Sequence, residues 1–220
     1  GDALITVPEA DGTPVTYKVW ETALMHPDLA AKFPELHTYA GCALDEGSKT
    51  IHLTISPEWG LRAIITRADL RTDYIEPLDW GKTDRYVVFD RATLPEGQRP
   101  ALQRLNETHF ERLTHDVYKK SGVQDRGGSS ALVRLKVFRL AVSCTGEFSV
   151  DHGGTVASTL AALLDYTNQI NIAFERDIAL RLQLFADQEK LIFTDPGGDP
   201  FFGQTVQEFA AQNNNVIKTY

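Results

Sequence analysis

The side chains best suited to bind a catalytic metal are sparse in this chain. Six histidines occur, at positions 26, 37, 52, 109, 115 and 152. Two histidines four residues apart on a helix share one face and can hold a metal ion together, but no two of the six have this spacing. His109 and His115 are six residues apart and would point to different sides of a helix. We therefore assign no catalytic residue and no zinc ligand within this chain.

The two cysteines, Cys42 and Cys144, lie far apart and form no C-x-x-C pair. This pattern encodes neither a structural zinc site nor a disulfide-dense scaffold. Two buried free thiols are the ordinary interpretation. A single bridge between Cys42 and Cys144 in an oxidising compartment stays open as the alternative.

Composition excludes several other classes of site and partner. With 22 basic and 30 acidic residues, the net charge of −8 repels phosphate backbones and anionic membrane surfaces. No apolar run approaches the roughly 20 residues that span a bilayer, so we expect neither a nucleic-acid partner nor membrane insertion. Gly146 and the pair Gly153-Gly154 precede helical patterns, yet no phosphate-binding glycine motif accompanies them.

The elements that would position any site begin with short strands. The Asp11-Gly12 step predicts a hairpin turn, since glycine accepts a positive φ, and Ile51, Leu53 and Ile55 alternate with polar residues as in a half-buried antiparallel strand. A short helix is predicted between Pro27 and Pro34. The strands are predicted at Ala3–Pro8, Pro14–Trp20, Leu36–Leu44, Thr50–Ser56, Gly60–Thr66, Asp73–Pro77 and Arg85–Phe89.

Residues 91–130 are polar and rich in charge, and they end in a Gly- and Ser-rich run. We predict a linker here, with a helix around Ala101–Leu113. Arg126 and Gly127 form a candidate processing site because proteolysis concentrates in exposed polar segments. An unprocessed loop is the alternative.

The remaining residues predict a βαβ unit. Val133, Leu135 and Val137 begin a strand that runs into the apolar Leu140–Val142, as expected for a strand covered on both faces. A long helix follows, then strands at Ile178–Phe185 and Lys190–Thr194 and a helical stretch over Phe202–Tyr220. The two strands flanking the long helix should lie parallel. The helix is predicted to bury one apolar stripe: Val156, Leu160, Leu163, Thr167, Ile170 and Phe174.

The predicted fold class is therefore α+β. A mainly antiparallel β domain at residues 1–90 is followed by the linker at 91–130 and by a partial α/β domain at 131–220. The last helical pattern, at Val216–Tyr220, has no glycine cap, and three strands are few for an α/β sheet. We expect this domain to be unfinished and the natural gene to extend past Tyr220.

Several separated blocks resemble a known family in order and spacing. Arg139–Phe148, His152–Ala157, Asn171–Asp177, Ile192–Pro196 and Asp199–Phe201 are similar to the start of the catalytic domain in reprolysin-like metzincin proteases secreted by bacteria. Upstream, Phe33–Gly41, Ile55–Ile64 and Tyr74–Pro77 resemble the propeptide-like domain that precedes it.

The resemblance implies a secreted zinc metalloendopeptidase, a zymogen whose signal peptide is not in this chain. The family holds zinc through three histidines of an HExxHxxGxxH helix, whose glutamate is the general base. This chain departs from the family there, because it lacks that motif and its only methionine is Met25. We expect the chain to be truncated before the zinc ligands and to be inactive alone.

The resemblance also suggests roles for individual residues. Cys42 is a candidate inhibitory thiol that would occupy the zinc before activation; a small buried strand residue is the alternative. Glu147, Asp195 and Asp199 are candidate calcium ligands. The alternative for the run Asp195–Pro200 is a rigid turn in which aspartates cap nearby amides.

The implied partners are the remainder of the catalytic domain or a related protease, with proteins or peptides as substrates of the parent enzyme. An extracellular binding, adhesion or protease-inhibitory module without catalytic function is the rival hypothesis. A small-molecule enzyme built on the βαβ unit would need convergent polar groups that the sequence does not nominate.

Overall fold

The computed structural model describes residues 2–79, 81–94, 134–202 and 205–219. Residues 1–93 and 135–220 belong to one compact unit, and residues 94–134 belong to another. The helix predicted at Ala101–Leu113 lies outside the described residues. The division into domains at 1–90, 91–130 and 131–220 stays a prediction.

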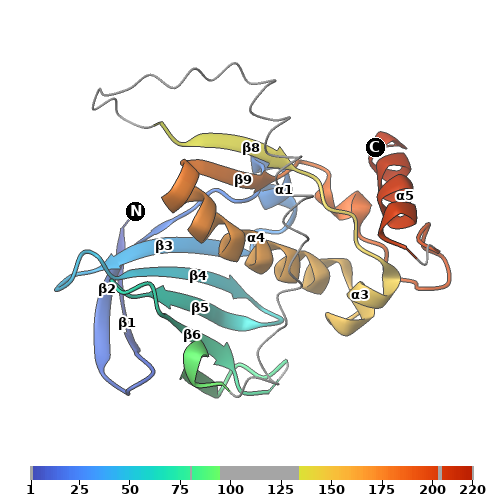
Figure 1. Cartoon of the computed structure of the whole chain (residues 1–220). Helices are drawn as coiled ribbons and strands as arrows, with labels where there is room; N and C mark the ends of the chain where they lie inside the picture. The colour runs from blue at the N-terminus through green and yellow to red at the C-terminus, as the bar shows by residue number, and fades with distance from the viewer. Residues whose placement is uncertain (1, 80, 95–133, 203–204, 220) are drawn as a thin grey trace. The chain divides into compact units, whose positions relative to one another are not determined.

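Seven antiparallel strands form the N-terminal sheet, and their order in the sheet is their order in the sequence (Figure 1). The first hairpin turns at Gly12, whose φ of 86° lies in the left-handed region, as the Asp11-Gly12 step predicts. The predicted strands are confirmed with ends that differ by at most one residue. They are β1 (Ala3–Pro8), β2 (Pro14–Glu21), β3 (His37–Ala43), β4 (Thr50–Ser56), β5 (Gly60–Thr66), β6 (Thr72–Pro77) and β7 (Tyr86–Asp90).

The two faces of this sheet differ in polarity. Ile51 and Leu53 of β4 lie in an apolar cluster with Tyr17 and other strand residues, whereas His52 and Thr54 point to the opposite face because strand side chains alternate. That opposite face is covered, since Asn168 of a later helix binds Thr54. The alternation read from the sequence is confirmed, and the polar face contacts protein as well.

The described C-terminal residues contain a parallel two-stranded sheet with helices around it, so the predicted α+β class is confirmed. Its strands join through the long helix, as the βαβ pattern predicts. Every helix in the described ranges is too short or too polar to cross a lipid bilayer. The elements are β8 (Lys136–Leu140), α3 (Gly146–Asp151), α4 (Val156–Ile178), β9 (Leu180–Leu184) and α5 (Val206–Thr219).

Local chemistry sets both ends of α4. Thr155 caps the first turn by accepting the N–H of Ser158, and Ser158 returns a bond to Thr155 in a capping box. The helix ends where Ala179 adopts the left-handed conformation, with φ of 52°. The helix therefore takes in Ile178, which the sequence pattern assigned to the following strand.

Two predictions for the C-terminal part are correct only in part. The strand expected at Lys190–Thr194 is reduced to one parallel bridge between Ile192 and Cys144, and Gln188–Leu191 form a 3-10 helix. The buried side chain of Gln188 bonds both the N–H and the C=O of Val142. The strand β8 is exposed from Lys136 to Arg139, whereas Leu140 and Val142 pack against an apolar cluster, as the apolar run Leu140–Val142 predicts.

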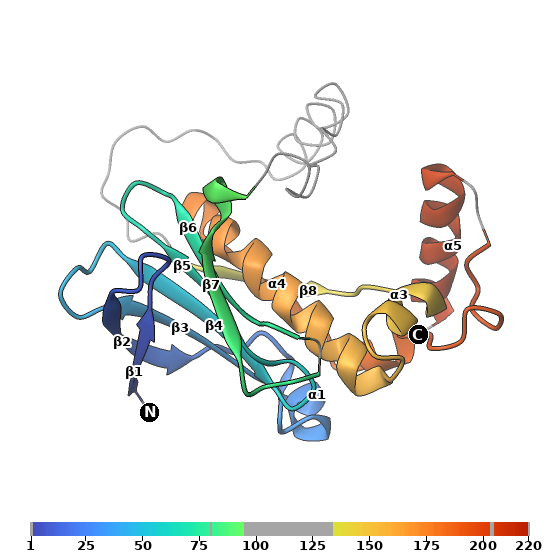
Figure 2. The same cartoon turned by 90° about the horizontal axis from the view of Figure 1, so that it is seen from below.

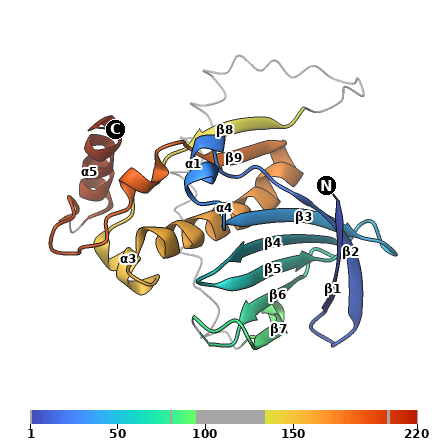
Figure 3. The same cartoon turned by 180° about the vertical axis from the view of Figure 1, so that it is seen from behind.

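One apolar cluster contains residues from the N-terminal and the C-terminal parts of the chain. Figure 2 shows α4 running alongside the strands of the N-terminal sheet. The short helix α1 (Pro27–Lys32) lies beside the end of β9 in Figures 1 and 3, and its Leu29 is fully buried there. The cluster unites Leu24, Met25, Leu29 and Leu36 with Cys144, Leu160, Ala161, Leu163, Leu164, Leu184 and Ile192. The first 40 residues and the last 80 therefore depend on a common core.

The backbone joins the same two regions. The Leu184 N–H donates to Leu24 O, and the His26 N–H donates to Leu184 O, both at 2.8 Å. These bonds place Met25 opposite Leu184 in a parallel bridge. The N-terminal segment thus extends the small sheet at the edge of β9 that β8 leaves open.

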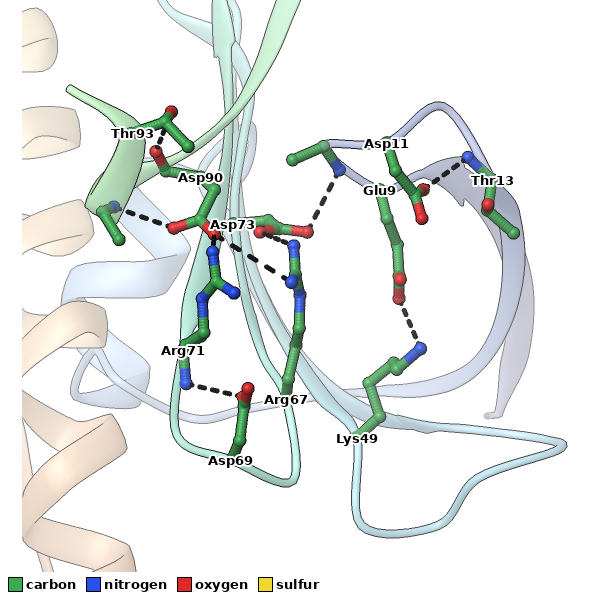
Figure 4. A network of polar contacts seen from close by, with 12 residues as sticks. Glu9, Asp11, Thr13, Lys49, Arg67, Asp69, Arg71, Asp73, Asp90 and Thr93 are labelled. Atoms are coloured by element: carbon green, nitrogen blue, oxygen red, sulfur yellow. Dashed lines mark hydrogen bonds and ion pairs between the residues drawn. The ribbon is translucent and has the colours of Figure 1, made fainter.

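A polar cluster holds the first hairpin against β6 (Figure 4). The fully buried carboxylate of Asp73 accepts the Ala10 N–H at 3.1 Å and pairs with Arg67. Arg67 also lies 4.0 Å from Asp90. Because Ala10 follows β1 and Asp73 belongs to β6, this cluster fixes the curvature of the sheet.

A second part of the cluster surrounds Glu9. Its carboxylate lies 2.7 Å from Nζ of Lys49 and accepts the hydroxyl of Tyr17 at 3.2 Å. Burial, reinforced by the Glu9 charge, raises the pKa of Tyr17 well above its ordinary value. Tyr17 therefore stays a neutral hydrogen-bond donor at the end of the apolar cluster.

Replacing Asp73 by alanine should loosen the curled sheet. The change strands the Ala10 N–H and leaves Arg67 with one weak partner, which costs about 2 kcal/mol of unfolding free energy and about 4–8 °C in Tm. Asp79→Ala is the control, because Asp79 forms only exposed pairs with Lys82 and Arg85. Equal Tm losses in the two variants, measured by scanning calorimetry, would contradict this role for Asp73.

Candidate functional site

The most unusual chemistry in the described residues lies where α4 crosses the polar face of the N-terminal sheet. Asp165 and Asn168 sit in the middle of this helix, and their exposed fractions are only 5% and 4%. Acidic side chains are almost never fully buried unless they are paired, and buried side-chain amides are almost always hydrogen-bonded. Each of these two therefore needs a partner on the sheet.

Arg62 of β5 supplies the partner for Asp165. Its Nη1 lies 2.7 Å from Asp165 Oδ2, and its Nη2 lies 2.8 Å from Glu76 Oε1 on β6. Burial raises the pKa of Asp165 even though the Arg62 charge opposes the shift. Burial disfavours the charge on Arg62, yet Asp165 and Glu76 outweigh it and raise the pKa of that guanidinium. Arg62 therefore remains a cation between two carboxyl groups.

Asn168 and Trp59 add neutral bonds to the same contact. The amide of Asn168 donates to Leu53 O at 3.0 Å and to Thr54 Oγ1 at 3.2 Å. Trp59, in the turn between β4 and β5, donates its indole N–H to Ser158 O at 3.0 Å. The sheet thus contacts α4 both at its first turn and near its middle.

Aromatic rings surround the indole of Trp59. The imidazole of His152 stacks on Phe148 with ring centroids 4.0 Å apart, and Trp59 lies 5.8 Å from the same imidazole. Nδ1 of His152 bonds Phe148 O at 2.7 Å. Tyr166 meets the imidazole edge-on at 6.0 Å. This cluster packs the β4–β5 turn against α3 and α4.

His52 occupies the same face of the sheet. Burial lowers its pKa to about 4; the Glu175 charge opposes this shift, and the Arg181 charge adds to it. Its Nδ1 has no hydrogen-bond partner among the described residues. The adjoining cavity is about 10 Å³ and is lined by Arg62, Asp165 and Asn168 among others, which is room for about one water molecule. The contact is therefore an interface, too tight to admit a substrate.

The candidate calcium ligands lie around the start of α3. Asp199 accepts the Gly146 N–H at 2.6 Å and the Phe201 N–H at 2.8 Å, and Asp195 accepts the Gly197 N–H at 2.9 Å. Glu147 lies in the first turn of α3. No side chain fits at Gly146, because a Cβ there would lie 2.2 Å from Pro196 N. The aspartates thus act as the turn alternative expects, and calcium binding stays a prediction.

Both cysteines are free thiols. Cys42 is half-buried on β3, opposite Thr50. Cys144 is buried, and burial raises its pKa to about 12, so it is an unreactive thiol at neutral pH. The inhibitory role of Cys42 stays a prediction. The processing candidates Arg126 and Gly127 lie outside the described residues.

The described residues do not fit the zinc site that the family resemblance implies. They include no group of three His, Cys, Asp or Glu side chains placed to hold a metal ion. His26 accepts the Asp28 N–H, and His37 bonds Glu21 at 2.9 Å. His109 and His115 lie outside the described ranges. We derive no catalytic step from these side chains.

Comparison with protein families gives a match over the C-terminal part of the chain. Residues 134–219, from just before β8 to the end of α5, match the sequence model of metallo-peptidase family M12B, reprolysin-like. This stretch is therefore similar to the reprolysin-like metallopeptidases, and we call residues 134–219 the reprolysin-like segment. Metallopeptidases of this family depend on zinc in general. No curated protein and no solved structure matches the chain.

The match covers less than half of the chain. Residues 1–133 lie outside it, so the resemblance of the first domain to a propeptide stays a prediction. The contact described above therefore joins the reprolysin-like segment, through α4, to a sheet from outside the match. This makes the interface the candidate functional site of the chain.

Sequence reasoning missed the residues that form this interface. The predicted apolar stripe on α4 is correct at Leu160, Leu163 and Thr167, but Ile170 and Phe174 are 44% and 37% exposed. Asn168 and Asn171 are buried instead. The polar residues directly after the apolar Leu163-Leu164 could have indicated a buried polar contact on α4. Nothing in the sequence identified Arg62 as the partner.

Protonation of His52 should destabilise the protein in mild acid. Because burial lowers its pKa to about 4 from 6.5, the unfolded chain binds the proton more tightly than the folded protein. The stabilisation is complete above pH 6.5 and is lost as pH falls toward 4; about 2 kcal/mol is lost by pH 4.5. Urea unfolding at pH 7.5 and 4.5 measures this loss.

His52→Gln should remove most of that pH dependence, because glutamine does not titrate. His37→Gln is the matched control, since the side chain of His37 is 40% exposed and pairs with Glu21 at the start of β3. If wild type and His52→Gln lose equal unfolding free energy between the two pH values, His52 is not the responsible group.

Proposed function

We propose that this chain is the N-terminal portion of a secreted zinc-dependent metallopeptidase that hydrolyses peptide bonds. Residues 134–219 supply the start of the catalytic domain, and residues 1–93 form a propeptide-like domain bound to it. The observation that carries the proposal is the family match over β8 to α5. The 220 residues contain no HExxH sequence, so the proposal places the zinc ligands outside them and treats this chain alone as inactive.

The exposed surface of the reprolysin-like segment supports this proposal. In the described ranges β8 pairs with β9 alone, so its other edge presents unpaired backbone groups. Val137 and Phe138 on β8 are 55% and 50% exposed, and Ile178 at the end of α4 is 60% exposed. Apolar surface beside an open strand edge is typical of a sheet that receives further strands. We propose that further catalytic-domain residues cover it.

The natural form of the protein tests this function. Its gene should continue past position 220 and soon encode a zinc-binding helix. That longer protein should contain about one zinc per molecule and cleave a quenched fluorescent peptide, and a zinc chelator should abolish the cleavage. The 220-residue chain is the control, with neither bound zinc nor cleavage expected.

Two results would contradict the proposal. One is a reading frame that stops at position 220, and the other is a longest natural form that binds no zinc. Either result would favour a binding or protease-inhibitory module. A pull-down with candidate extracellular proteases as bait would then test the inhibitory role directly.

A further inference from the structure

We propose that residues 1–93 stay bound to the reprolysin-like segment as a non-covalent subunit when the chain is cut between Leu94 and Arg134. Such a cut would not release the N-terminal part, and a separate event would be needed to dissociate it. The regulatory meaning of this inference rests on the proposed peptidase function, but the binding itself does not.

The first support is a strand that the N-terminal part contributes to the other half. Met25 lies in register with Leu184, and two backbone bonds of 2.8 Å flank the pair. Gln183 also donates its side-chain amide to Ala23 O at 3.0 Å. Removing the N-terminal part would open a second edge on a sheet that has two other strands in the described residues, and open edges are unfavourable.

The second support is the shared apolar core. Leu160, Leu164 and Leu184 have no exposed surface in the intact chain, and they pack in one cluster with Leu24 and Leu29. Separation would expose apolar surface on both pieces at once. Interfaces that resemble a domain core cut in half are typical of permanent complexes.

The third support is the polar contact with α4. Arg62 lies between Asp165 and Glu76, so separation would leave Asp165 without its cation. Trp59 is anchored by its bond to Ser158 O and by the rings of Phe148 and His152. Buried arginine and tryptophan anchors are the residue types that carry most of the affinity in protein interfaces.

Exposed charges at the edge of the contact fix its orientation. Lys32 of α1 pairs with Asp187 at 3.3 Å and with Glu189. Its side chain is 41% exposed, so these pairs add little affinity. They hold α1 over the 3-10 helix of the reprolysin-like segment.

A cut made in the folded chain tests the inference. A recognition sequence for a site-specific protease is inserted within residues 95–133, and the cut protein is applied to size-exclusion chromatography at micromolar concentration. Both fragments should elute together at the volume of the uncut chain and separate only in denaturant. Separate elution in native buffer would overturn the inference.

Variants in the cut protein identify what holds the fragments together. Arg62→Ala should raise the Kd between the fragments about 30-fold or more, because it strands a buried carboxylate. Arg85→Ala is the matched control, since Arg85 pairs only with the exposed Asp79, and it should leave Kd unchanged. Equal Kd values for these two variants would contradict the role of the α4 contact.

A milder change covers the case in which Arg62→Ala does not fold. Trp59→Phe keeps an aromatic ring in the cluster but removes the N–H that bonds Ser158 O, and it should raise Kd about threefold to tenfold. An unchanged Kd would contradict the anchoring role of Trp59. None of these measurements needs zinc or activity, so their failure would leave the peptidase proposal intact.

Discussion

The ion pair between Asp165 and Arg62 constrains how the two halves of this protein meet. A carboxylate in the middle of a buried helix is strongly unfavourable without a partner, and its partner comes from a strand about 100 positions earlier in the sequence. Only one placement of α4 on the sheet brings the two together. Asn168, about one turn further along, then reaches Leu53 O. The ion pair therefore determines where α4 lies along the sheet, and it adds little net stability.

This register divides α4 into two functionally different parts. Its first half carries Leu160 and Leu164, which enter the apolar cluster with Leu24 and Leu29. Its second half buries amides and leaves Ile170 and Phe174 exposed. The apolar half stabilises the contact between the N-terminal residues and the reprolysin-like segment. The polar half restricts that contact to one arrangement. Both halves face the N-terminal residues, so the reprolysin-like segment owes much of its order to a region outside the family match.

How far the sequence predicts this structure depends on the range of each interaction. The N-terminal strands, the Gly12 turn and most of α4 follow from alternation, turn residues and periodicity, which act within a few positions. The errors come from distant partners. The buried Gln188 bonds Val142 beside a predicted strand that is reduced to one bridge, and Arg62 pairs with Asp165 in the interface. Periodicity assigns apolar side chains to the buried face of a helix, so it predicted burial for Phe174. It did not predict burial for Asn168, whose amide donates to Leu53 O on β4.

The same difference in range bears on how the protein folds. Apart from the connection between β2 and β3, which contains α1, the seven strands are joined by short connections. They pair in sequence order, so most of their contacts close small loops. The bond between Gln183 and Ala23 spans 160 positions, and closing so long a loop costs more chain entropy. The sheet has little such cost to overcome, and it already presents Arg62 and the Leu53 carbonyl. It therefore provides a formed surface on which α4 and β9 can order.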